Sequence, residues 1–267
     1  MRIRVIFSLK NKGAVLPFHH QKLIWNLAKE ILGPGFPLED QSFCYSGLKG
    51  QTKVGREGLH YFSKRVTIVF SSADKVFINL LIQKTFEQPH LTLGNLVLIP
   101  EKVEEEVAPE YQEHMKFLCI SPLVIRNERS NTRNKEFIFP TTDEFSDLLY
   151  ESTMFRMEKS GKFSAEEISS FFRFQIIPDS KYLERITKSE KKFARIYTLI
   201  IDGSIKEIRG YTFPFEFYAD PTVQRFIFEN GFGELTNHGF GMLDVPQDTP
   251  PERRVIYSVS GEEEPDA

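Results

Sequence analysis

The sequence predicts an α+β protein made of two tandem ferredoxin-like units, each with the order strand, helix, strand, strand, helix, strand. Apolar residues recur with the periods of strands and helices in that order along the first hundred residues, and a similar order returns after an acidic stretch at 101–113. Hydrophobic residues make up 40% and charged residues 27% of the 267 residues, a mixture typical of a globular protein. We expect each unit to hold a four-stranded antiparallel sheet with helices on one face, which leaves the other face free to bind a ligand.

The first unit is expected over 1–105. Arg2 and Arg4 alternate with apolar residues at the start of a strand, and apolar residues after His19 follow the i, i+4, i+8 spacing of an amphipathic helix. The run Gly-Pro-Gly at 33–35 ends that helix. The expected elements are strands at 2–9, 43–48, 65–72 and 94–104, and helices at 19–32 and 73–86.

The second unit is expected over 115–245, after an acidic linker at 106–114. A capping pattern opens the first helix, and Asp202-Gly203 is a hairpin signal. The expected elements are strands at 115–125, 173–179, within 191–220 and at 239–245, and helices at 141–161 and 221–231. The remaining residues, 246–267, combine prolines with terminal acids and are expected to form a flexible acidic tail.

Composition limits the classes of function. The net charge is only −3, so a surface for nucleic acid must be a local basic patch. The two cysteines, Cys44 and Cys119, lack a CxxC partner, which argues against a zinc site and a disulfide framework and favours a reducing cytoplasm. No apolar run reaches transmembrane length. We therefore expect a cytoplasmic protein without a membrane partner, metal or cofactor.

A glycine-rich loop at 231–241 is the most unusual local feature. Its glycines are Gly231, Gly233, Gly239 and Gly241, and the order helix, loop, strand matches neither a dinucleotide-binding nor a P-loop motif. One interpretation is that the glycines let an RNA backbone approach and expose N–H groups to phosphate. The other is a glycine-bounded hairpin with Phe232 and Phe240 in the core.

Four stretches together resemble one known family. The glycine loop, LPFHHQ at 16–21, FCYSGLKG at 43–50 and KFLCISPLVI at 116–125 occur in the order found in CRISPR repeat-processing endoribonucleases of the RAMP superfamily. The resemblance covers the chain up to about Val245. It implies two ferredoxin-like domains across a cleft that bind CRISPR repeat RNA. It also implies cleavage without a metal, in which the ribose 2′-hydroxyl attacks the adjacent phosphate and leaves a 2′,3′-cyclic phosphate and a 5′-hydroxyl.

That reaction needs a base, an acid and a group that stabilises phosphate charge. His20 is the first candidate base and His19 the second, Tyr45 could donate a proton, and Lys49 could stabilise the phosphate, a role that the family gives to a nearby lysine. The alternatives are a capping or packing role for either histidine, an ordinary strand aromatic for Tyr45 and a solvated loop for Lys49. The family usually carries its catalytic histidine between the first helix and the first hairpin, and the corresponding stretch here, 32–43, contains none.

RNA binding is expected from local basic clusters and the glycine loop. A solvated charged face is the alternative interpretation of each cluster. The candidate RNA-binding residues are Lys53, Arg56, Lys64, Arg65, Arg129, Arg133, Gly231, Gly233, Asn237, His238, Gly239 and Gly241.

Three hypotheses of function follow. The first is a metal-independent endoribonuclease that matures CRISPR RNA, with other CRISPR effector subunits and a second copy of the chain as further candidate partners. The second is a non-catalytic repeat-RNA-binding subunit of a surveillance complex, which the missing family histidine keeps open. The third is an unrelated small-molecule enzyme on a ferredoxin-like scaffold.

Overall fold

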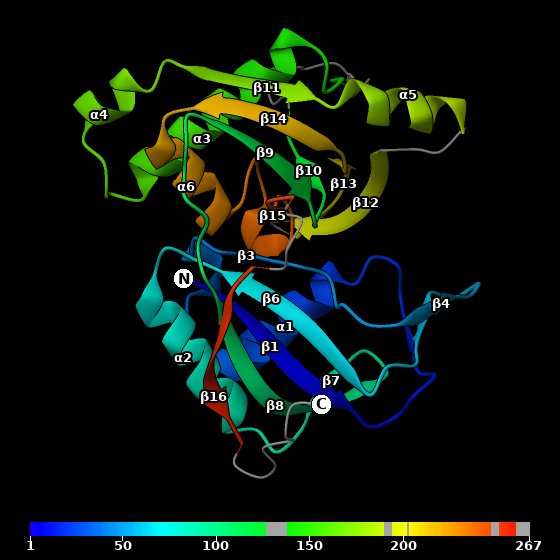
Figure 1. The fold of residues 1–267 in the computed structure, drawn as a ribbon. Helices are drawn as coiled ribbons and strands as arrows, with labels where there is room; N and C mark the ends of the chain where they lie inside the picture. The colour runs from blue at the N-terminus through cyan, green and yellow to red at the C-terminus, as the bar shows by residue number, and fades with distance from the viewer. Residues whose placement is uncertain (127–137, 190–193, 202, 247–250, 260–267) are drawn as a thin grey trace.

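The computed structural model describes residues 1–126, 138–189, 194–201, 203–246 and 251–259. The chain forms two stacked α+β units (Figure 1), with the first unit below, mostly in blue and cyan, and the second above, mostly in green, yellow and orange. Both units have the ferredoxin-like order of elements, which confirms the predicted fold class.

The first unit is an antiparallel sheet whose core strands follow the order β8-β1-β6-β3. Along β1, Ile3, Val5 and Phe7 are buried in the core that α1 and α2 cover, whereas Arg2 and Arg4 lie on the opposite face. Asp74 caps α2 by accepting hydrogen bonds from the N–H groups of Val76 and Phe77. The elements are β1 (Arg2–Leu9), α1 (Gln21–Leu32), β3 (Cys44–Tyr45), β6 (Arg65–Ser71), α2 (Lys75–Phe86) and β8 (Leu96–Glu106).

The second unit repeats this topology with the strand order β11-β14-β9-β15. Phe215 and Phe217 of β14 are buried in its aromatic core, while Glu216 and Tyr218 alternate onto the open face. The elements are β9 (His114–Cys119), α3 (Asp143–Lys159), β11 (Phe174–Pro178), β14 (Pro214–Ala219), α6 (Pro221–Asn230) and β15 (Leu243–Asp244).

Each unit also carries a small extra sheet. In the first unit it is built from β2 (Val15–Leu16), β4 (Thr52–Val54) and β5 (Leu59–Tyr61), so part of the basic connection predicted between two strands is a hairpin. In the second unit it is built from β10 (Leu123–Val124), β12 (Ala194–Ile201) and β13 (Ser204–Tyr211), and the strand expected at 115–125 is therefore divided between two sheets. The remaining elements before the C-terminal strand are β7 (Leu91–Leu93), which pairs with β8, α4 (Ala165–Ser170), α5 (Ser180–Lys188), and the 3-10 turns η1 (Leu38–Asp40) and η2 (Thr236–His238).

The expected acidic linker at 106–114 is one residue too long at each end, because β8 ends at Glu106 and β9 begins at His114, and part of the expected flexible tail is a strand. Residues 101–106 belong to β8, because Arg2 and Arg4 of β1 pair with Glu104 and Glu106 and make this acidic stretch a favourable strand partner. Residues 107–113 join the two units without a helix or strand. In the tail, β16 (Arg253–Ser258) pairs with β8 and extends the first sheet.

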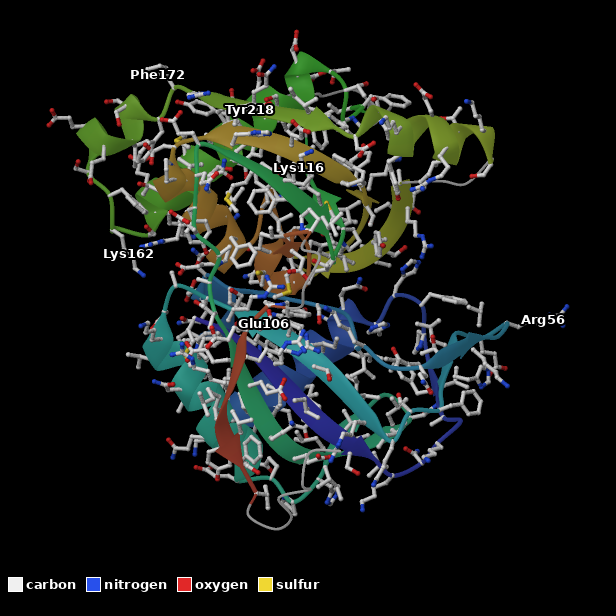
Figure 2. All side chains as sticks on the ribbon, viewed as in Figure 1. Arg56, Glu106, Lys116, Lys162, Phe172 and Tyr218 are labelled. Carbon is white, nitrogen blue, oxygen red and sulfur yellow. The ribbon has the colours of Figure 1, made fainter. Side chains whose placement is uncertain are left out.

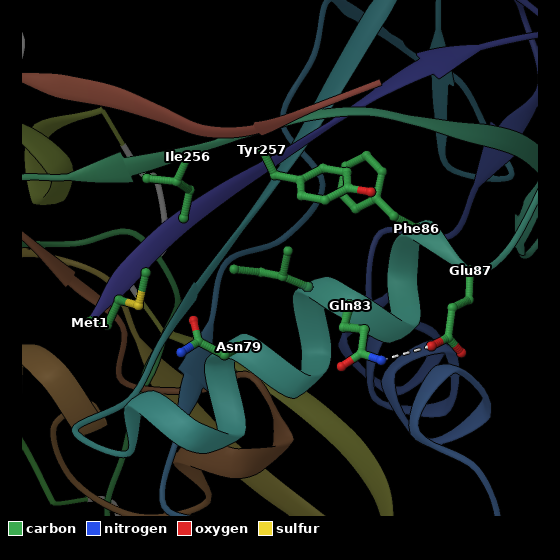
Figure 3. Close-up of a pocket in the computed structure, with 8 residues that line it drawn as sticks. Met1, Asn79, Gln83, Phe86, Glu87, Ile256 and Tyr257 are labelled. Atoms are coloured by element: carbon green, nitrogen blue, oxygen red, sulfur yellow. Dashed lines mark hydrogen bonds between the residues drawn. The ribbon is translucent and has the colours of Figure 1, made fainter. Parts of the chain in front are cut away.

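The C-terminal strand β16 lies beside α2, and residues of both line an open pocket of about 610 Å³ (Figure 3). The Tyr257 ring packs against Phe86 with ring centroids 4.2 Å apart. Gln83 donates a hydrogen bond to Glu87 at 3.1 Å on the rim. The packing of β16 on α2 explains why a sequence with the composition of a tail is ordered at 253–258.

Within the residues that the structure describes, no helix has both the length and the apolar character needed to cross a membrane.

Candidate nucleic-acid interface at the domain junction

The glycine-rich loop lies at the interface between the two units. Gly231 has φ +83°, and a Cβ atom there would lie 2.9 Å from the Cys44 Cβ of the first unit. Gly239 has φ +86°, and its Cβ would lie 2.5 Å from the Tyr45 ring. A side chain at either position would therefore separate the units, in addition to the strain of the left-handed backbone.

The other two glycines pack within the second unit. A Cβ at Gly233 would collide with the Val124 carbonyl oxygen, and one at Gly241 would collide with that of Phe232. These contacts alone explain the need for glycine at all four positions. The RNA-binding role expected for the glycines stays a prediction. Phe232 and Phe240 are buried, which agrees with the alternative interpretation of the loop as a glycine-bounded hairpin.

Arg156 of α3 holds the loop in place. Its guanidinium donates hydrogen bonds to the carbonyl oxygens of Asn230, Gly231 and Gly233, at 2.7 to 2.9 Å. It also donates to the Thr236 hydroxyl at 3.2 Å. Burial lowers the pKa of Arg156 to about 10, which still leaves it charged at neutral pH. The side chain thus satisfies carbonyl groups that the end of α6 leaves without helical partners.

Polar contacts lock the loop to the first unit. The Asn230 side-chain oxygen accepts hydrogen bonds from the Ser42 hydroxyl and the Ala73 N–H, at 3.3 and 3.2 Å. Arg2 donates to the Leu243 carbonyl oxygen at 2.6 Å while it pairs with Glu106. Because these groups come from both units, the junction has a defined geometry that can position side chains for a ligand.

His20, the first candidate base, is buried within the first unit. It is 6% exposed, and its Nε2 accepts a hydrogen bond from the Leu48 N–H at 3.0 Å. Its Nδ1, which must then carry the ring proton, lies 3.0 Å from the Pro17 carbonyl oxygen. Burial lowers the pKa of His20. Both nitrogens are occupied, so this geometry supports a structural role for His20 and does not support the expected base role.

Tyr45 is also structural in this arrangement. Its side chain is fully buried, and its hydroxyl donates a hydrogen bond to the Gln21 carbonyl oxygen at 2.9 Å. Burial raises the pKa of Tyr45 well above its ordinary value. The proton-donor role expected for Tyr45 requires contact with RNA, and the packing of Gly239 against its ring leaves it no such access.

Lys49 lies on the charged face of the first sheet. Its backbone pairs with Thr67 of β6, and its side chain is half-buried. Burial, and then the positive charge of Arg4, lower the pKa of Lys49, while Asp244 and Glu106 act in the opposite direction. The charged residues that affect the pKa of Lys49 therefore lie on β1, β8 and β15. His19, by contrast, contacts β12.

His19 is the exposed member of the predicted histidine pair, and it meets the second unit. Its ring lies edge-to-face against Tyr197 of β12, with centroids 4.5 Å apart. Burial and then the charge of Arg195 lower the pKa of His19. Burial raises the pKa of Tyr197. The structure thus brings a histidine, a tyrosine and an arginine together at the junction.

The polar residues of the glycine loop pack on α1 and η1. The His238 ring stacks on Trp25 with centroids 5.7 Å apart, and burial followed by the charge of Lys22 lowers the His238 pKa. The Asn237 amide donates to the Glu39 carbonyl oxygen at 3.0 Å. The RNA-binding roles expected for both residues remain predictions, although His238 is only half-buried.

The predicted basic residues of the connection at 49–65 are exposed. Lys53 and Arg56 lie on the β4–β5 hairpin, which projects from the first unit (Figure 2). Lys64 precedes β6, and Arg65 pairs with Glu101 of β8 at 2.6 Å. Arg129 and Arg133 lie outside the described residues. The part of the chain that is described contains no group of three or more His, Cys, Asp or Glu placed to hold a metal ion.

Sequence reasoning missed Arg156 and Tyr197, and it gave Arg195 no catalytic role. Arg156 lies within helix α3, and Arg195 and Tyr197 lie at the start of a strand that was expected only as part of the long region 191–220. Nothing local marks these residues, because their partners lie far away in the sequence. The only local signal for this part of the site was an aromatic residue, Tyr197, close to a basic residue, Arg195, in one strand.

Comparison with known proteins agrees with this arrangement. The family model described as CRISPR associated protein Cas6, C-terminal, matches residues 101–245. An endoribonuclease-like protein Cas6 of Pyrococcus furiosus is 22% identical over 256 residues, which cover 92% of this chain and 98% of the relative. The Cas6nc protein of Pyrococcus horikoshii is 23% identical, over 92% of this chain and 99% of its own.

Solved structures share the fold. A Cas6-related protein from Pyrococcus furiosus has a TM-score of 0.75 at 22% identity, covering 93% of this chain and 99% of its own. A structure described as a RAMP protein binding different RNA substrates has a TM-score of 0.74 at 22% identity, covering 92% of this chain and 100% of its own.

The chain consists of two ferredoxin-like units that meet through a glycine-rich loop, and its overall fold is shared with these solved structures. The family model spans more than half of the chain. The chain therefore belongs to the Cas6 family, and the hypothesis of an unrelated small-molecule enzyme is not retained.

Proposed function

We propose that this protein binds CRISPR repeat RNA and cleaves the precursor transcript, with His19 at the domain junction as the group that takes the proton from the attacking 2′-hydroxyl. Membership of the Cas6 family and the endoribonuclease-like names of its relatives support the reaction class. The observation that carries the site is the contact of an exposed histidine on one unit with Tyr197 on the other.

The chemistry follows from the protonation states at the junction. The pKa of His19 lies below its ordinary value, so the imidazole is neutral at pH 7 and can accept a proton. The O2′–P bond forms and the P–O5′ bond breaks, which leaves a 2′,3′-cyclic phosphate and a 5′-hydroxyl. The exposed Arg195 guanidinium stabilises the charge on the phosphate, and the departing 5′-oxygen takes a proton from solvent. Tyr197 acts as a positioning residue that holds the imidazole.

Cleavage of labelled repeat RNA in excess EDTA tests this proposal. We expect one cut per repeat, a 2′,3′-cyclic phosphate on the upstream fragment, and no cut when the nucleotide before the scissile phosphate is 2′-deoxy. His19→Ala should slow cleavage by about 100- to 10,000-fold and keep RNA affinity, whereas His90→Ala, which removes an exposed histidine from the α2–β7 turn, should cleave normally. Cleavage of the 2′-deoxy substrate would rule out the mechanism.

A second candidate is a non-catalytic protein that binds repeat RNA. Two observations favour it: the stretch 32–43 has no histidine, and both nitrogens of His20 are occupied. Tight binding of repeat RNA without any cut after long incubation would select this candidate. We also propose that the protein is cytoplasmic, that it associates with other effector subunits and that it self-associates. Size-exclusion chromatography with and without RNA tests self-association.

A further inference from the structure

The open face of the second sheet carries a stacked pair of rings that the proposed cleavage site does not use. His114 of β9 and Tyr218 of β14 are register partners on adjacent strands. Their rings are parallel within 3°, with centroids 4.3 Å apart. The core lies on the other face, where Phe215 and Phe217 are buried.

One carboxylate fixes both rings. Glu216 accepts hydrogen bonds from His114 Nε2 at 2.9 Å and from the Tyr218 hydroxyl at 3.2 Å. Lys116 lies 3.1 Å from its other oxygen. Hydrogen bonds from Lys116 and then from His114 lower the pKa of Glu216, so the carboxylate is charged. The edges of the rings are therefore held in place while their π-faces remain available.

The stack is accessible. The side chain of His114 is 43% exposed and that of Lys116 is 63% exposed. Figure 2 shows Tyr218 and Lys116 on the sheet face turned toward the viewer. On the side of β9 that faces away from β14, the neighbouring strand β15 pairs only with Leu118 and Cys119. Among the described residues, no strand therefore pairs with His114 on that side. A further planar ring can therefore extend the column.

The chemistry of the site fits a nucleobase better than a phosphate. A carboxylate at the centre repels a directly bound phosphate, but it can accept a hydrogen bond from an amino group of a base. Lys116, beside the stack, can meet the backbone phosphate of the same nucleotide. Aromatic side chains on an open ferredoxin-like sheet are a known type of platform for unpaired RNA bases.

We propose that His114 and Tyr218 form a stacking platform for one unpaired base of single-stranded RNA, with Lys116 beside it for the phosphate. The inference deepens the proposed function, on which it rests, by assigning the single-stranded part of the RNA to the open face of the second sheet.

The test uses two probes, the 2′-deoxy-blocked repeat RNA and an unrelated single-stranded oligonucleotide, each scanned with 2-aminopurine. One position in each probe should lose fluorescence on binding, because the base stacks on the rings. Tyr218→Leu and His114→Leu should weaken binding about 5- to 150-fold, the range that corresponds to base–aromatic stacking of ~1–3 kcal/mol. The quench should disappear in both variants.

Tyr218→Phe keeps the ring and should bind within about twofold of wild type, since the interaction is mainly with the π-face. Gln175→Ala, which changes the exposed register partner of Tyr218 on β11, should bind like wild type. Thermal melting of each variant checks that the fold is retained.

The outcomes separate the two proposals. Unchanged affinity and quench in Tyr218→Leu, in a protein that still cleaves repeat RNA, would overturn the platform and leave the cleavage function standing. Ring-dependent binding without any cleavage would support the platform and overturn the cleavage function. Failure of the wild-type protein to bind either probe would overturn both.

Discussion

The rings of His19 and Tyr197 meet edge-to-face across the junction of the two units, with centroids 4.5 Å apart. Because His19 precedes α1 of the first unit and Tyr197 lies in β12 of the second, this contact exists only when the units are docked. Changes that loosen the junction should therefore affect cleavage as well as stability.

The rate of cleavage should depend on the protonation of His19. The active form is neutral and its pKa is lowered by burial and by Arg195, so the rate should rise with pH through a midpoint below about 6.5 and then level off. Arg195→Gln should move this midpoint upward and slow cleavage. His19→Ala should reduce the single-turnover rate by about 100- to 10,000-fold and remove the rise of the rate with pH. If the rate of His19→Ala still rises with pH through the same midpoint, the titrating group is not His19.

His20 should contribute to stability and to its pH dependence. Loss of its two hydrogen bonds in His20→Ala should cost about 1–3 kcal/mol, measured by urea unfolding near neutral pH. Its folded-state pKa is lowered, so the unfolded chain binds more protons as the pH falls through about 6.5, and wild-type stability should decrease there. His20→Ala should show a smaller decrease between about pH 7.5 and 5.5. An equal decrease in both proteins would contradict this role.

Arg156 should be essential for an ordered glycine loop. Arg156→Met removes four hydrogen bonds and leaves buried carbonyl groups unsatisfied, so we expect a loss on the order of 3 kcal/mol. Lys159→Met changes an exposed cation near the end of the same helix and should alter stability by less than about 0.5 kcal/mol. Chemical unfolding near neutral pH provides both values, and equal values would refute the role of Arg156.

Gly239 should tolerate no side chain. Gly239→Ala combines left-handed strain of about 1–2 kcal/mol with a contact of 2.5 Å to the Tyr45 ring. Gly161 also has a positive φ, +65°, but among the described residues nothing lies within 4 Å of the place that its Cβ atom would take. Gly161→Ala should therefore show the strain alone, and the difference between the two melting temperatures measures the cost of separating the units. Equal melting temperatures would show that the Tyr45 contact is relieved without separation.

The β4–β5 hairpin should contribute electrostatic affinity for RNA. Changing both Lys53 and Arg56 to Gln should lower the slope of log affinity against log salt by roughly 1–2, with similar effects on all sequences. Lys84→Gln is a suitable control because Lys84 pairs with Glu87 on α2. Filter binding between about 50 and 200 mM salt would detect the change, and parallel lines for all three proteins would exclude the hairpin from the RNA site.

The tandem ferredoxin-like fold could be predicted because its signals are local. The period of apolar residues along β1 and α1, the capping residues of α2 and α3, and the alternation Phe215, Phe217, Ala219 on β14 are all visible in short windows. The glycine loop was also visible as a feature, but its contacts were not. Whether a glycine faces RNA or Tyr45 depends on residues of the other unit.

Sequence alone thus established the fold class, the order of the core helices and strands, and the pair of histidines at the start of α1. Tertiary packing determined the rest. Packing within the first unit buried His20 with both nitrogens occupied, and packing within the second unit placed Arg156 against the carbonyl groups of the glycine loop. Docking of the two units placed the exposed His19 against Tyr197. The physical reason is that periodicity and capping act between neighbours in the chain, whereas burial and hydrogen-bond saturation of a histidine depend on groups that only folding brings together.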